Sequence, residues 1–139
     1  MGDVFCRLMR RLFIPALMLG LMAAPLTAQD LSALARLNPA ESEIVETGAG
    51  VGITLALSQP VPWRVRLMDQ PPRLIIDTRE VDWTGIAALQ RVDSITALRA
   101  GVFRQGWSRL VLQLAGPVRF AEAGMETGGP AASLRLRLE

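Results

Sequence analysis

The chain of 139 residues contains no histidine, no lysine and no tyrosine, and only one cysteine. Without histidine it lacks imidazole zinc ligands, the Ser-His-Asp and Cys-His catalytic arrangements, and the commonest general base near neutral pH. Every basic residue is therefore an arginine. These absences argue against an independent catalyst, and we expect no catalytic residue, no metal ligand and no cofactor in this chain.

The first 28 residues have the three-part pattern of a secretory signal peptide. Three arginines within the first eleven residues precede a charge-free apolar run over residues 12–24, and the small residue Ala28 stands before Gln29. Proline and glycine interrupt the run, which is also shorter than the roughly 20 residues of a membrane-spanning helix. We therefore predict a signal peptide over 1–28, cleavage after Ala28, and no stable membrane span once it is removed.

Export predicts a periplasmic location in a Gram-negative bacterium. The pair Arg10-Arg11 before the apolar run is also typical of twin-arginine signals, so the sequence leaves the Sec and twin-arginine routes open. Cleavage would remove Cys6 together with three of the 15 arginines and one of the 13 acidic residues, which leaves a net charge near zero. Because nucleic-acid binding needs a surplus of clustered positive charge, we expect no nucleic-acid partner.

From residue 51 onward, short segments alternate between apolar and polar residues, which is typical of half-buried strands. The expected strands cover residues 51–58, 63–67, 73–78, 95–101, 107–114, 117–123 and 133–139. Pro-rich and Gly-rich segments separate them, and a short helix is expected near 86–89. The pattern predicts an all-β sandwich or small barrel of about seven or eight strands. We assign 29–49 to a linker or short N-terminal element and 50–139 to the domain.

Three of these segments carry motifs that occur together in a known family. Residues 72–77 read proline-arginine-hydrophobic-aspartate, residues 95–103 end in arginine-x-glycine-x-phenylalanine, and residues 106–114 hold an arginine-hydrophobic-valine strand. In this order they resemble the AMIN domain, the N-terminal module of exported bacterial N-acetylmuramoyl-L-alanine amidases, which also occurs in the secretins of type IV pilus machines. The family often has aspartate where this chain has Gln113.

The resemblance implies a small two-sheet β-sandwich that binds peptidoglycan and localises its parent enzyme. Such amidases cleave the amide between N-acetylmuramic acid and L-alanine with zinc held in a separate downstream domain. Since this chain has no histidine, we expect the catalytic domain and its zinc to be absent from it. Peptidoglycan is the expected partner, with a periplasmic regulator or division proteins as further ones. The alternatives are the structural anchor of a secretin or other envelope assembly, and an unrelated exported β-sandwich with a protein partner.

Four charged residues are the first candidates for binding. Arg73 and Asp77 lie four residues apart on one expected strand, so they share a face. Arg99 and Arg109 are expected on neighbouring strands, and arginine suits the carboxylates of stem peptides because its planar fork grips them bidentately. The alternative is cross-strand Arg–Asp pairing that only stabilises the sheet.

Aromatic side chains near expected turns are the second group of candidates. Phe103 and Trp107 could stack on sugar rings, or they could cap the open end of the sandwich, as Trp83 could. Trp63 alternates in phase with apolar residues and is expected in the core. The carboxylates of Asp77, Glu80 and Asp82 cluster by sequence alone, which is weak support for a glycosidase acid–base pair.

Overall fold

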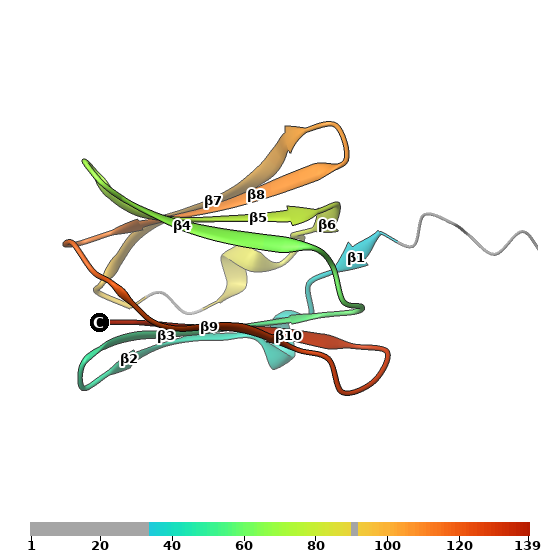
Figure 1. The fold of residues 1–139 in the computed structure, drawn as a ribbon, viewed down its shortest axis with the longest axis horizontal. Coiled ribbons are helices and arrows are strands. Elements are labelled where there is room, and N and C mark those ends of the chain that lie inside the picture. Colours follow the sequence, from blue (N-terminus) through green and yellow to red (C-terminus); the bar gives the residue numbers. More distant parts are fainter. Residues whose placement is uncertain (1–33, 90–91) are drawn as a thin grey trace, which may run out of the picture. The chain divides into compact units, whose positions relative to one another are not determined.

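The computed structural model describes residues 34–89 and 92–139, so the predicted signal peptide and Cys6 lie outside the described residues. Two antiparallel sheets of four strands pack face to face as two layers (Figure 1). One sheet has the order β2-β3-β10-β9 and comprises β2 (Glu43–Thr47), β3 (Gly50–Leu57), β10 (Ala132–Leu138) and β9 (Phe120–Glu126). The other has the order β4-β5-β8-β7 and comprises β4 (Trp63–Asp69), β5 (Pro72–Arg79), β8 (Trp107–Leu114) and β7 (Ile95–Arg104). The predicted all-β, two-sheet fold is confirmed.

The two sheets divide the chain between its ends and its middle. β3 pairs with β10 in antiparallel register, from Val51 opposite Leu138 to Leu57 opposite Ala132, so strands from both ends of the domain lie side by side. The middle of the chain forms the other sheet from the hairpins β4-β5 and β7-β8. In the described part of the chain, no helix is long and apolar enough to cross a membrane.

A short segment links the two layers at one edge. β1 (Ala35–Arg36) pairs in parallel with β6 (Val81–Asp82), which follows β5, and Leu37 forms an isolated bridge with Leu57 of β3. Two one-turn 3₁₀ helices, η1 (Pro39–Glu41) and η2 (Ile86–Ala88), complete the connections. The second agrees with the short helix expected near 86–89.

The core forms where the inward residues of the two sheets meet, because alternate side chains of a strand point to opposite faces. Its fully buried members include Ile53 and Leu55 on β3, Leu134 and Leu138 on β10, Leu74 and Ile76 on β5, and Leu110 and Leu112 on β8. Trp63, Val65 and Leu67 of β4 pack against this cluster, as their alternation predicts. The opposite residues of the same strands face outward, and on the β4-β5-β8-β7 sheet seven of these are arginines.

The structure differs from the sequence analysis in two strands. Residues 43–47, assigned to a linker or short N-terminal element, form the edge strand β2. Only Ile44 of β2 is buried, so this strand has no apolar alternation to reveal it. The strand expected over 117–123 begins instead at Phe120, because Pro117 has no N–H to donate and the pairing with β10 starts there.

Candidate functional site

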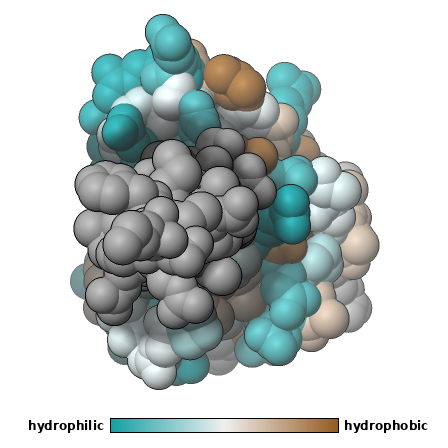
Figure 2. All heavy atoms as spheres, turned by 90° about the vertical axis from the view of Figure 1, so that its right-hand side faces the viewer, coloured by the Kyte–Doolittle hydropathy of each residue, from teal (hydrophilic) through white to brown (hydrophobic). Residues whose placement is uncertain are grey.

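The outward face of the β4-β5-β8-β7 sheet holds seven arginines. We call this surface the arginine face. Its arginines are Arg64 and Arg66 on β4, Arg73 and Arg79 on β5, Arg109 on β8, and Arg99 and Arg104 on β7. Among the outward positions of these four strands, all of them described, Asp77 is the single carboxylate. Figure 2 shows hydrophilic residues gathered in its upper part, on the layer that includes β7 and β8.

Asp77 lies at the centre of an ion-pair cluster on this face. Arg109 donates to it through both Nε, 2.6 Å from Oδ1, and Nη2, 3.0 Å from Oδ2. Arg64 donates from the other side, with Nε 2.9 Å from Oδ2, and Arg66 Nη2 lies 3.5 Å from the same oxygen. These side chains cover Asp77 completely, although Arg64 itself is about half exposed. The carboxylate therefore joins β4, β5 and β8 across the outside of the sheet.

The guanidinium groups keep Asp77 ionised. The hydrogen bonds from Arg109 lower the pKa of Asp77 below its ordinary value, and those from Arg64 act in the same direction. Burial alone would raise the pKa of this carboxyl, but its effect is the smaller one. Asp77 and Arg109 were both candidates for contacting a ligand, and the structure brings them together with each other in the cross-strand pairing that was the alternative interpretation.

Two aromatic rings lie among the arginines. The Cζ atom of Arg109 lies 3.4 Å from the ring centroid of Phe103, so the phenyl ring covers the guanidinium that binds Asp77. Trp107 is surrounded by the guanidinium groups of Arg64, Arg79 and Arg104, at 5.6, 5.9 and 5.1 Å from its ring centroid. Such contacts combine cation–π attraction with packing of the arginine stems. Phe103 and Trp107 thus belong to the arginine face.

Trp83 has a different role from the other two turn aromatics. It is buried on the inner side of the β4-β5-β8-β7 sheet, and its Nε1 donates to Ser108 Oγ at 3.1 Å. The same hydroxyl lies 2.9 Å from Thr78 Oγ1 and accepts the backbone N–H of Val81 at 3.2 Å. This buried polar cluster attaches β6 and the segment after it to the sheet.

Arg73 and Arg99 lie at the other end of the arginine face, away from Asp77. With Pro71, Ala97, Val111 and Gln113 they line a hollow of about 100 Å³. Neither arginine side chain has a hydrogen bond or an ion pair with any residue that the structure describes, and Nε of Arg73 is buried without a partner. The predicted charged candidates are therefore split between an ion-paired cluster at Asp77 and a pair of arginines without an acidic partner at this end.

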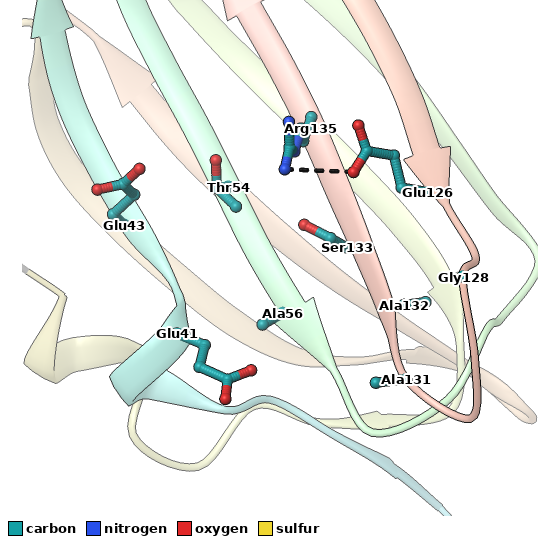
Figure 3. Close-up of a pocket in the computed structure, with 10 residues that line it drawn as sticks. All are labelled: Glu41, Glu43, Thr54, Ala56, Glu126, Gly128, Ala131, Ala132, Ser133 and Arg135. Carbon is teal, nitrogen blue, oxygen red and sulfur yellow. Dashed lines mark ion pairs between the residues drawn. The ribbon is translucent and has the colours of Figure 1, made fainter.

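The outward face of the β2-β3-β10-β9 sheet has a different charge pattern. Here acidic and basic side chains pair across strands, as in Arg135–Glu126 at 3.2 Å and Arg137–Glu122 at 3.7 Å. A trough of about 560 Å³ lies on this face. Figure 3 shows Glu41 and Glu43 on one side of it and the Arg135–Glu126 pair on the other. Since its cation is already paired, the trough is unsuited to an anionic ligand.

The carboxyls of Asp77 and Asp82 lack the raised pKa expected of a glycosidase general acid. A glycosidase needs a general acid whose pKa is raised. The pKa of Asp77 is lowered by Arg109, and that of Asp82 is lowered by hydrogen bonds from the hydroxyl and backbone N–H of Thr84. Within residues 34–89 and 92–139, no group of three or more acidic, cysteine or histidine side chains is arranged to hold a metal ion.

Four members of the arginine face were not among the predicted site residues: Arg64, Arg66, Arg79 and Arg104. Alternation in residues 63–67 already points Arg64 and Arg66 away from the core, so that signal was present in the sequence. The near-zero net charge concealed the clustering, because a total says nothing of where charges lie. The argument from net charge against a polyanionic partner therefore does not hold for this face.

A comparison with models of known protein families and with curated protein sequences finds no match to this chain.

Proposed function

We propose that this chain comprises an export signal and a non-catalytic peptidoglycan-binding module, similar to an AMIN domain, that localises an N-acetylmuramoyl-L-alanine amidase in the periplasm. The observation that supports the proposal best is the arginine face, with seven guanidinium groups and one carboxylate on its outward strand positions. The stem peptides of peptidoglycan carry carboxylates, and arginine binds carboxylates with two parallel hydrogen bonds. Zinc and the amidase reaction would belong to the parent enzyme.

The shape of the arginine face also suits a polymer better than a small substrate. Neighbouring strands lie about 4.8 Å apart, so the face presents cations repeatedly across a broad sheet. Exposed ionic contacts are individually weak, at about 0–1 kcal/mol each. A ligand with many carboxylates could engage several of them together and gain affinity through multivalency. Wall attachment requires this kind of binding.

The proposal can be tested by co-sedimentation of the full chain with purified sacculi. The test variant carries Arg79→Gln and Arg104→Gln, which lie beside Trp107 and make no ion pair with a described residue. The matched control carries Arg135→Gln and Arg137→Gln, which remove the same charge from the other sheet.

We expect the test variant to bind about tenfold more weakly, because two exposed contacts of about 0.7 kcal/mol each amount to that factor. The control should bind within about twofold of the wild type, and salt should weaken binding because it screens exposed charges. Equal losses in both double variants would refute the assignment to the arginine face. Equal affinity for duplex DNA would indicate a general polyanion site and count against wall targeting.

A further inference from the structure

We infer that Arg73 and Arg99 form a subsite for a single carboxylate at the end of the arginine face remote from Asp77. This inference rests on the proposed function for the identity of its ligand, a free carboxylate of a stem peptide. It assigns different roles to arginines that share one face. Arg64 and Arg109 stabilise the sheet through Asp77, whereas Arg73 and Arg99 are available to a ligand.

The subsite is built by three adjacent strands. Arg73 of β5 lies opposite Gln113 of β8, which lies opposite Ala97 of β7, and Arg99 lies opposite Val111 in the next row. The two arginines therefore approach the same hollow from β5 and β7, with the strand β8 between them as its floor. The hollow of about 100 Å³ has the volume of roughly three water molecules at about 30 Å³ each. That volume suits the three heavy atoms of a carboxylate group.

The charges at the subsite are not compensated by the protein. Neither arginine side chain has a hydrogen-bond or ion-pair partner among residues 34–89 and 92–139, and neither stacks on one of the aromatic rings of the face. The Nε–H of Arg73 is also buried without an acceptor, which is unfavourable for a polar group. By contrast, Nε and Nη2 of Arg109 already donate to Asp77.

Because residue 113 is a neutral glutamine, no carboxylate of the chain lies opposite Arg73 on β8. Gln113 occupies the position opposite Arg73, as Asp77 occupies the position opposite Arg64 and Arg109. A carboxylate in place of Gln113 could pair with Arg73 and compete with a ligand. The neutral amide can still donate a hydrogen bond to a bound carboxylate. The residue at 113 therefore determines whether the arginine pair is free.

The direct test is a titration of the full chain with small ligands, monitored through the NMR signals of the arginine Nε–H groups. The ligands are N-acetylalanine, which has a free carboxylate, its uncharged amide, and inorganic phosphate. We expect saturable shifts of the Arg73 and Arg99 signals with N-acetylalanine, and no response to the amide. Arg73→Gln should weaken this binding at least tenfold, and Arg135→Gln on the other sheet should leave it within twofold. Equal binding of the amide, or binding of phosphate alone, would overturn the inference.

A second variant tests the subsite even if Arg73→Gln fails to fold. Gln113→Glu keeps both arginines and adds a carboxylate beside Arg73, so the chain should remain folded and bind N-acetylalanine at least tenfold more weakly. Unchanged binding by this folded variant would refute the subsite.

Sacculi whose carboxylates have been amidated separate this inference from the proposed function. The inference predicts that amidation abolishes the effect of Gln113→Glu on sacculus binding. If the wild type binds sacculi and Gln113→Glu binds them equally well, wall binding stands and the subsite fails. If N-acetylalanine binds but intact sacculi do not, the arginine pair binds carboxylates, and its assignment to stem peptides is overturned together with the proposed function.

Discussion

The two outward sheet faces of this sandwich use arginine in opposite ways. On the β2-β3-β10-β9 sheet, Arg135 and Arg137 lie beside glutamates of the neighbouring strand, and all four side chains are more than half exposed. On the outward face of the β4-β5-β8-β7 sheet, seven arginines accompany one carboxylate, Asp77, which is fully buried and contacts three of them. The first face is compensated pair by pair, whereas the second has a surplus of positive charge.

This difference distinguishes arginines that stabilise the fold from arginines that are available to a ligand. Exposed pairs on the first face are hydrated, so they contribute little to stability and leave little charge for a ligand. On the arginine face, the buried carboxylate of Asp77 engages three guanidinium groups strongly, and the remaining arginines lack an acidic partner on their strands. A surface of this kind combines a rigid centre with free cations around it. The same residue type therefore has two roles within one sheet.

The largest effect is expected at the centre of the arginine face. Asp77→Asn keeps the size of the side chain but removes its charge, so the bidentate contact with Arg109 is lost. We expect the free energy of unfolding to fall by about 2 kcal/mol, because the freed arginines are partly exposed and become hydrated. Urea denaturation of the variant and the wild type measures this difference. A loss below about 0.5 kcal/mol would mean that the cluster does not stabilise the sheet.

The stability difference between the wild type and Asp77→Asn is expected to depend on pH. Because Arg109 and Arg64 lower the pKa of Asp77 below 3.8, its charge contributes fully to stability above pH 3.8 and is lost as the pH falls through the folded-state pKa. The stability difference between wild type and Asp77→Asn should therefore be constant near neutral pH and shrink below 3.8. The lowered pKa of Asp82 cancels, since both proteins contain it. A difference that grows in acid would contradict the assignment.

A smaller effect is expected beneath the arginine face, at the buried hydroxyl of Ser108. Ser108→Ala removes the acceptor for Trp83 Nε1 and for the backbone N–H of Val81. We expect a loss of about 1.5 kcal/mol, the cost of leaving buried donors unsatisfied. Ser133→Ala on β10 is the matched control, because its hydroxyl faces the trough on the other sheet. Thermal unfolding followed by tryptophan fluorescence should distinguish the two variants.

The smallest effect is expected on the compensated face. Glu126→Gln breaks the exposed pair with Arg135 and should cost no more than about 0.5 kcal/mol in urea denaturation. It changes the charge by the same amount as Asp77→Asn, which makes it the reference for that variant. A loss as large as that of Asp77→Asn would show that the two faces do not differ as described.

The outward placement of most site residues could be predicted from alternation, whereas their contacts with one another could not. The period of two places Arg73, Asp77 and Arg109 outward, and the structure agrees. It says nothing of which strands become neighbours. Asp77 meets Arg64 from 13 residues earlier and Arg109 from 32 residues later, because β5 lies between β4 and β8. The edge strand β2 was missed for a related reason, since its place depends on pairing with β3.

The sequence by itself determined most of the strands of the two sheets, their inward residues and the absence of histidine chemistry, because these follow from local periodicity and composition. Only the tertiary structure decided how the charges are distributed. Sheet order brings arginines from four strands to one face, and register places Gln113, a neutral residue, opposite Arg73 while Asp77 lies opposite Arg109. Alternation within one strand decides only the face on which each residue lies, whereas the pairing of β5 with β8 joins segments far apart in the chain.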